Sequence, residues 1–300
     1  GASGVSAFKR LVRKRSSPPV FGGLIGALVT PFDESGNIDY ESFGTLIHHV
    51  IGRGVRSLVP ASLTGEFFSM TFDERAAIMR FVAGVCEGRA RVLASTFSTR
   101  AEETLALCQL AADLGYSGAI VAAPIAVAPS REEIFNYYRW IDSEAGLPLI
   151  LYNYPSRIGV DLDSSLVVEL ANLPRVIAYK DTSGQVARLQ DILADVPSLE
   201  VICGVDELAV ESYAWGVRAL LGGTACFLAP EHSAMLEAGA ARKDARGAAA
   251  IMMEMIPVLR LLERSGKYIQ MCRAGCEIDG IRVGLPRRPL LPLAPSEKDL

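Results

Sequence analysis

Lys180 closes an apolar run, residues 175–179, and is followed at once by the polar turn 181–184. A lysine that ends a buried strand is partly desolvated, and desolvation disfavours the ammonium form. A neutral amine is nucleophilic near neutral pH and can condense with a ketone to form a Schiff base. Lys180 is therefore a candidate covalent catalyst; the alternative is that it is a salt-bridge partner at a strand end.

A second apolar run, residues 148–151, ends on Tyr152 and is followed by Arg157. A phenol can transfer protons, and a guanidinium can bind a carboxylate. Taken singly, Tyr152 has the alternative of a core residue with a satisfied hydroxyl, and Arg157 that of an ion-pair partner on a loop. A catalytic role requires that the fold bring both side chains to Lys180.

The composition limits the classes of function. A formal net charge of −4 argues against nucleic acid as the main partner, and the basic run 9–15 is interpreted as a solvated arm. No segment resembles a signal peptide or approaches the roughly 18 apolar residues of a membrane span, so the expected localisation is cytoplasmic. The six cysteines form no C-x-x-C pair and are expected to be reduced, and the three histidines are too few to favour a His-rich metal site.

Short apolar runs alternate with longer segments of helical period along most of the chain. This alternation is typical of βα units on a parallel sheet. Eight runs at a spacing of roughly 25–30 residues favour an α/β fold of the closed (β/α)8 TIM barrel type, with additional C-terminal helices. The expected strands are residues 24–30, 56–62, 91–96, 118–124, 148–154, 175–180, 199–204 and 218–223.

We expect three parts in the chain: an N-terminal arm, residues 1–20, disordered or loosely attached; the barrel, residues 21–228; and a C-terminal helical extension, residues 229–300. The extension has apolar stretches that must pack on the barrel or on another subunit. Capping boxes at Thr71 and Ser130 mark the starts of two helices of the barrel.

In a βα barrel the carboxyl ends of the strands form one mouth, so residues that follow different strands become neighbours. Asp206 and Glu207 have a simpler alternative as the start of the next helix, where the helix dipole favours carboxylates. The residues expected at the mouth are Thr64, Gly65, Glu66, Tyr152, Arg157, Lys180, Gly204, Val205, Asp206 and Glu207.

At these positions the chain resembles the dihydrodipicolinate synthase and N-acetylneuraminate lyase superfamily of class I Schiff-base barrels, over residues 22–295. Five motifs in the expected order make the resemblance specific. They are residues 26–32 (GALVTPF), 64–66 (TGE), 152–159 (YNYPSRIG), 180–184 (KDTSG) and 284–290 (GLPRRPL).

The resemblance implies that Lys180 forms an imine with pyruvate or another 2-oxo acid and that Tyr152 transfers protons. It also implies that Thr64 and Gly65 bind the carboxylate of the 2-oxo acid. The expected partner is a small-molecule substrate, with no nucleic acid and no membrane. The expected assembly is a homotetramer or homodimer, without metal or organic cofactor.

Two departures from the synthase branch make dihydrodipicolinate synthesis a less expected activity. That branch has a hydroxyl residue before Thr64 as part of a proton relay, whereas this chain has Leu63. It also has a tyrosine pair where this chain has residues 123–127 (APIAV). Leu63 and residues 125–127 are expected to form an apolar wall of the site, which favours a shorter or less polar substrate tail. Thr182 and the Asp206-Glu207 pair are similar to the residues at these positions in the sugar-acid members of the superfamily. Two carboxylates at a barrel mouth also suit a substrate with a polyhydroxylated tail.

The leading hypothesis is therefore a lyase, an aldolase or dehydratase, that forms a Schiff base at Lys180 and acts on a keto-deoxy sugar acid or a related 2-oxo acid. Gly204, Thr182 and the acidic pair are candidates for recognising the substrate tail. Arg157 is compatible with a substrate that has a second carboxylate. The alternative within the class is 4-hydroxy-tetrahydrodipicolinate synthase. The alternative from another class is a non-catalytic barrel that binds 2-oxo acids.

Overall fold

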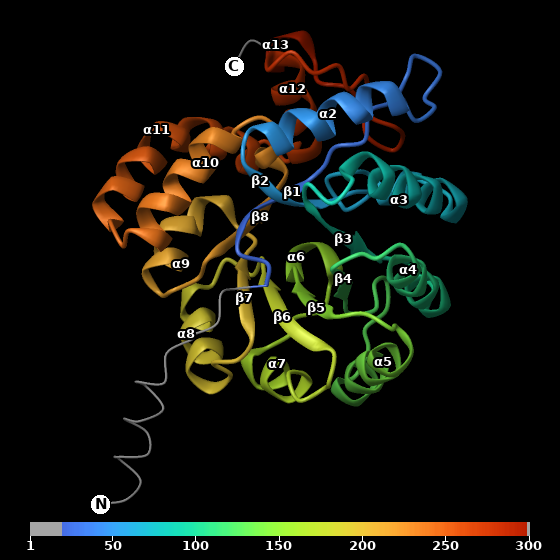
Figure 1. The fold of residues 1–300 in the computed structure, drawn as a ribbon, viewed down its shortest axis with the longest axis vertical. Coiled ribbons are helices and arrows are strands. Elements are labelled where there is room, and N and C mark those ends of the chain that lie inside the picture. Colours follow the sequence, from blue (N-terminus) through green and yellow to red (C-terminus); the bar gives the residue numbers. More distant parts are fainter. Residues whose placement is uncertain (1–19, 299–300) are drawn as a thin grey trace, which may run out of the picture.

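The computed structural model describes residues 20–298, and in it eight parallel strands close into a barrel in sequence order (Figure 1). The first strand, β1, pairs with both β2 and β8, which closes the cylinder. The strands are β1 (Gly23–Ala27), β2 (Val55–Val59), β3 (Arg91–Ser95), β4 (Gly118–Ala122), β5 (Leu149–Asn153), β6 (Val176–Asp181), β7 (Glu200–Cys203) and β8 (Ala219–Gly222).

The eight predicted strands and the barrel are confirmed, with boundaries that differ by at most three residues. Strands of a parallel barrel are covered by side chains inside and by helices outside, so they are apolar on both faces. All five residues of β4 and all five of β5 are buried. The sequence signal is strong for this reason: each strand is a short apolar run bounded by polar turns.

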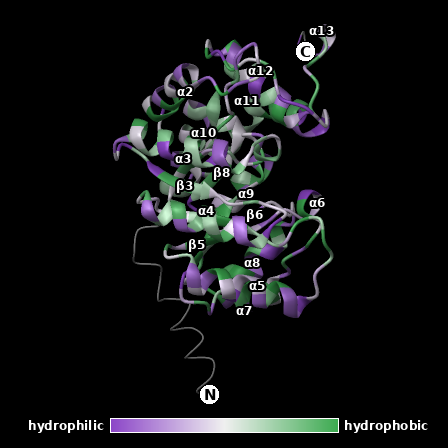
Figure 2. Ribbon diagram, turned by 90° about the vertical axis from the view of Figure 1, so that its right-hand side faces the viewer, coloured by the Kyte–Doolittle hydropathy of each residue, from purple (hydrophilic) through white to green (hydrophobic). Residues whose placement is uncertain are grey.

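The helices of the barrel surround the strands (Figure 1). Helices such as α5 and α7 have both hydrophilic and hydrophobic residues, as an outer layer must (Figure 2). Both predicted capping boxes are present, at Thr71 before α3 and at Ser130 before α5. The helices of this region are α2 (Tyr40–Gly52), α3 (Phe72–Cys86), α4 (Ala101–Asp113), α5 (Arg131–Glu144), α6 (Pro155–Ile158), α7 (Ser164–Leu170), α8 (Val186–Asp195) and α9 (Ala209–Ala214).

The additional C-terminal helices are also confirmed: α10 (Ala229–Leu236), α11 (Ala245–Arg264), α12 (Tyr268–Ile278) and the short α13 (Pro295–Lys298). Buried residues of this region, among them Met252, Leu259 and Cys272, belong to the same hydrophobic core as the barrel residues. The predicted boundary at 228/229 coincides with the start of α10, and the division of the chain there stays a prediction. Except for Val20, the predicted N-terminal arm lies outside the described residues.

All six cysteines are free and buried, as predicted. Among residues 20–298, no helix is long and apolar enough to cross a membrane. His49 is paired with Asp279 at 2.6 Å, and His48 contacts Arg89 at 3.0 Å, so both belong to polar contacts of the helical layer.

Candidate active site

Lys180 and Tyr152 lie side by side inside the barrel. They are register partners on the neighbouring strands β5 and β6, and the Lys180 Nζ lies 4.3 Å from the centroid of the Tyr152 ring. Both side chains are buried, with exposed fractions of 8% and 4%. The amine and the phenol are therefore within one small volume, as the convergence of strand ends predicts.

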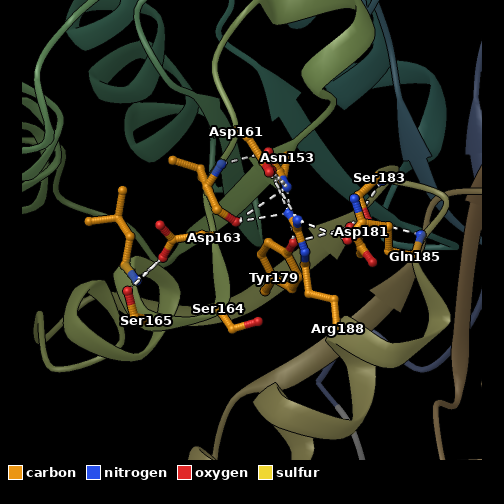
Figure 3. A network of polar contacts seen from close by, with 12 residues as sticks. Asn153, Asp161, Asp163, Ser164, Ser165, Tyr179, Asp181, Ser183, Gln185 and Arg188 are labelled. Atoms are coloured by element: carbon orange, nitrogen blue, oxygen red, sulfur yellow. Dashed lines mark hydrogen bonds and ion pairs between the residues drawn. The ribbon is translucent and has the colours of Figure 1, made fainter.

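The direction of the Lys180 side chain follows from the period of two along β6. Its neighbours Tyr179 and Asp181 point outward into a polar network under the helices (Figure 3). There the Tyr179 hydroxyl donates to Asp181 Oδ1 at 3.1 Å, and Asn153 Nδ2 donates to Asp161 Oδ1 at 2.9 Å. This network ties together the ends of β5 and β6, so the strands that hold Tyr152 and Lys180 are fixed from behind.

Burial acts on the ionisation of both groups. It lowers the pKa of Lys180 to about 8, although the negative charge of Asp206 and the Cys203 thiol act in the opposite direction. Burial also raises the pKa of the Tyr152 phenol well above its ordinary value, and the neighbouring Thr182 hydroxyl and Arg157 offset only part of that rise. At neutral pH the site thus contains an amine with a larger neutral fraction than an ordinary lysine, next to a protonated phenol.

A cavity of about 590 Å³ opens at the carboxyl ends of the strands. Of the residues predicted at the mouth, Gly65, Glu66 and Glu207 do not line this cavity. Those that line it are Thr64, Tyr152, Arg157, Lys180, Gly204, Val205 and Asp206. Thr182, expected from the family resemblance, lines it too. Gly65 instead packs against backbone: a Cβ there would lie 2.8 Å from the Leu28 carbonyl oxygen.

The loop that contains Thr64 and Gly65 is fixed by a buried ion pair. Glu66 is fully buried, has a left-handed backbone conformation with φ 63°, and pairs with Arg273 of α12 at 2.8 Å. The other Glu66 oxygen accepts from the Arg287 backbone N–H at 2.8 Å. Arg273 also donates to the Thr30 carbonyl at 2.7 Å. Glu66 therefore joins the cavity loop, α12 and the C-terminal segment into one unit.

Two glycines make room for the polar groups at the mouth. A Cβ on Gly204 would lie 2.8 Å from Lys180 Cε and 2.7 Å from the Asp181 carbonyl oxygen. A Cβ on Gly222 would lie 2.4 Å from Asp206 Oδ1. Since real Cβ atoms do not approach other atoms so closely, both positions require glycine for packing around the lysine and the carboxylate.

A family model for the dihydrodipicolinate synthetase family matches residues 20–300. The chain belongs to that family. It is 33% identical over 92% of its length to a 4-hydroxy-tetrahydrodipicolinate synthase of Synechococcus elongatus, and the match covers 92% of that protein. A second such synthase, from Halalkalibacterium halodurans, is 30% identical over 92% of this chain and 94% of its own.

Solved structures of the family superimpose closely. Dihydrodipicolinate synthase from Bacillus anthracis gives a TM-score of 0.88 at 28% identity, covering 93% of this chain and 95% of that chain. A prophage protein of the dihydrodipicolinic acid synthase family from E. coli K12, in complex with pyruvate, gives 0.89 at 27% identity, covering 94% and 96%. As a member of the dihydrodipicolinate synthetase family, the chain is a class I Schiff-base lyase, and this part of the sequence prediction is confirmed.

Several cavity residues of this family member were not predicted from the sequence. Glu263, at the end of α11, is exposed at the rim of the cavity; partial burial, together with the charges of Asp206 and Glu207, raises its pKa to about 7. Tyr268 enters from α12, and its hydroxyl accepts from the Gly223 backbone N–H at 3.1 Å. Both come from the C-terminal helices, and no local motif marks them.

Buried hydroxyls also line the cavity. The hydroxyls of Ser62, Ser95 and Thr182 have no hydrogen-bond partner within residues 20–298. An unpaired buried hydroxyl costs free energy, so a ligand that offers hydrogen bonds there is favoured. Only Thr182 was predicted, from the resemblance to the sugar-acid members of the superfamily.

The apolar wall of the cavity differs from the expected one. Leu63 lines the cavity, but the loop that contains Ile125, Ala126 and Val127 does not. The loop turns outward, with Ala126 at φ 64° and Val127 59% exposed. The apolar wall is made instead by Leu63, Phe67, Phe97, Ile120, Leu221, Ile269 and Leu290. Within residues 20–298, no group of three or more His, Cys, Asp or Glu side chains is placed to hold a metal ion.

Proposed function

We propose that Lys180 is the lysine that forms the Schiff base, with pyruvate or another 2-oxo acid as the carbonyl partner. The observation that supports this assignment is the position of its buried Nζ, 4.3 Å from the Tyr152 ring in the cavity at the barrel mouth. Burial lowers the pKa of this amine to about 8, which favours nucleophilic attack. Condensation of the amine with the ketone takes up one proton and releases one water. The resulting cationic imine withdraws electrons from the neighbouring bond that breaks.

Tyr152 is the proposed acid and base. Its raised pKa keeps the phenol protonated in the free enzyme, ready to donate to the carbinolamine hydroxyl as water leaves. Thr64 and Gly65 are proposed to bind the carboxylate of the 2-oxo acid; the rigid support of their loop by Glu66 and Arg273 favours this role, because carboxylate binding requires fixed donors.

The proposed substrate is a keto-deoxy sugar acid or a related 2-oxo acid with a hydroxylated tail. The unpaired hydroxyls of Ser62, Ser95 and Thr182 favour such a tail, since each gains a hydrogen bond to a substrate hydroxyl. Asp206 and Glu263 add acceptors at the same cavity. Of the other predicted tail contacts, Gly204 leaves space and Arg157 lies at the exposed rim, whereas Glu207 acts only through its charge on Glu263.

A second candidate is 4-hydroxy-tetrahydrodipicolinate synthase, the activity by which the relatives of about one-third identity are named. Arg157 in the cavity lining favours it, because a guanidinium suits a second carboxylate. Leu63 opposes it, because an alkyl side chain cannot relay a proton where the synthase branch has a hydroxyl.

Two assays test these proposals. Borohydride is added to the protein with each member of a panel of 2-oxo acids, and mass spectrometry with peptide mapping identifies the modified lysine. We expect a reduced adduct on Lys180; an adduct on another lysine only, or none with any 2-oxo acid, contradicts the assignment. Turnover is then compared between keto-deoxy sugar acids and the pair of pyruvate and aspartate semialdehyde. Faster turnover of the latter pair selects the synthase.

We further propose that the protein is a homotetramer or homodimer that works in the cytoplasm. The support for assembly is an apolar groove of about 620 Å³ at α11, α12 and the C-terminal segment, with the exposed side chains Ile278 and Leu285 beside it. Apolar surface of this kind is typical of subunit contacts. Light scattering coupled to gel filtration gives the mass in solution, and a monomer contradicts the proposal.

A further inference from the structure

Beneath the cavity, a chain of buried polar groups runs from Asp206 to a histidine that the catalytic scheme does not use. Thr224 Oγ1 lies 2.6 Å from Asp206 Oδ2 and 2.8 Å from His232 Nε2. Tyr268 donates a longer hydrogen bond to the same Asp206 oxygen, at 3.4 Å. Thr224 and His232 are fully buried, and Asp206 is 3% exposed. Such a network deep in a protein core is costly unless every member is oriented.

The chemistry of the three groups fixes the direction of the hydrogen bonds. A carboxylate only accepts, so the single Thr224 hydrogen goes to Asp206, and His232 Nε2–H must donate to the Thr224 oxygen. Burial lowers the pKa of His232, so the ring is neutral and its other nitrogen, Nδ1, is unprotonated. Nδ1 has no hydrogen-bond partner within residues 20–298. The opposite direction requires a protonated Asp206 and a buried Nδ1–H without an acceptor, which is less stable.

The Asp206 end of this chain acts on Lys180. Both residues line the same cavity, and the carboxylate is the largest of the influences that raise the pKa of Lys180 against the effect of burial. A negative charge here favours any cation at that nitrogen, whether ammonium or the iminium that follows imine formation. How well Asp206 does this depends on its charge and on its orientation.

We propose that His232 is a positioning residue that, through Thr224, holds the Asp206 carboxylate oriented toward Lys180, so that the iminium at Lys180 is stabilised. The inference rests on the proposed role of Lys180 and adds a function for a residue that touches neither substrate nor lysine. Because the hydrogen-bonded network passes through the Thr224 hydroxyl, removal of that hydroxyl separates His232 from Asp206.

Other titratable groups surround the network and define the controls. They are Tyr152 of β5, Cys203 of β7, Tyr213 of α9, Glu231 of α10, Glu263 of α11, and Tyr268 and Cys272 of α12. Glu263 has a pKa of about 7, within the range of the assay. The variant Glu263→Gln therefore reports any contribution of this carboxyl to the pH profile.

The test measures borohydride trapping of pyruvate on the intact protein from pH 5.5 to 9.5. Thr224→Val and His232→Leu remove the hydroxyl and the ring donor. We expect each to lower the apparent pKa for trapping by about one unit and to weaken the pyruvate imine about tenfold, because Asp206 is no longer held toward Lys180 and stabilises the cation there less. Thr224→Ser and His232→Gln retain a hydroxyl and an N–H donor, and we expect both to restore the wild-type profile.

The outcomes separate the inference from the proposed function. If the wild type gives no trapping at Lys180, the proposed function fails. If the wild type is trapped and folded Thr224→Val and His232→Leu have unshifted pH profiles, only the network inference fails. A loss of trapping by the same factor at every pH means that His232 is merely structural and overturns the inference. If both variants fail to fold, the pH profile of trapping by Asp206→Asn and ¹⁵N NMR of the wild-type histidines decide. An unshifted pH profile for Asp206→Asn, or a His232 ring protonated at Nδ1, overturns the network inference.

Discussion

Replacement of Lys180 by methionine should stabilise the protein at neutral pH while abolishing its chemistry. Methionine has a similar length and no charge, so it fills the same space in the barrel without the cost of burying an ammonium. The pKa of Lys180 falls from an ordinary 10.5 to about 8 in the folded protein. At about 1.36 kcal/mol per pKa unit, the folded state loses about 3 kcal/mol at pH 7, where the unfolded and most of the folded molecules are protonated.

The pH dependence gives the sign of this effect. Because the pKa is lower in the folded state, the unfolded state binds more protons between about pH 8 and 10.5, and the wild type gains stability as the pH rises through this window. Below pH 8 the penalty is fully present. The advantage of Lys180→Met over wild type should therefore be about 3 kcal/mol at pH 7 and fall below about 1 kcal/mol at pH 10.

Urea unfolding at pH 7 and pH 10, at one protein concentration, measures these differences. The matched control is Lys243→Met, which changes an exposed lysine and should alter stability by less than about 0.5 kcal/mol at either pH. Thermal unfolding at pH 7 should show a rise in Tm of about 6 °C for Lys180→Met. The reasoning would be wrong if Lys180→Met were no more stable than wild type at pH 7, or if its gain in stability did not shrink at pH 10. Either result would show that burial does not disfavour the charged form of Lys180.

Three further changes test the site. Tyr152→Phe should lower turnover by about 10²–10⁴-fold in steady-state assays, because the phenol is the proposed acid and base; a loss below about tenfold removes that role. Lys180→Arg should give no borohydride adduct with an unchanged circular dichroism spectrum, because a guanidinium does not form imines, and an adduct on this variant would identify another lysine. Gly204→Ala places a methyl 2.8 Å from Lys180 Cε and should lower turnover about 10²-fold by moving the amine. The control is Gly84→Ala, which has no atom within 4 Å of the added methyl. Equal turnover of the two variants would contradict the packing argument.

The predictions from sequence were best where the physics is local. The eight strands were found because each is an apolar run between polar turns, and both capping boxes were found because Thr71 and Ser130 each have an acidic residue three positions later. Lys180 and Tyr152 were found because each ends such a run. The expected apolar wall at 125–127 was wrong, because nothing in a short loop of small apolar residues tells whether the backbone turns toward the mouth or away from it.

The sequence by itself determined the barrel, the order of its strands and the two residues proposed to perform the lyase chemistry, since these depend on patterns within a few residues. Only the tertiary structure decided what surrounds them: that Glu66 pairs with Arg273, that Glu263 and Tyr268 enter the cavity from the C-terminal helices, and that Asp206 is joined through Thr224 to His232. These contacts join residues distant in sequence, and their geometry follows from how the helices pack on the closed sheet. The charge of an amine depends on that packing, because neighbours brought from afar set its solvation and its electric field.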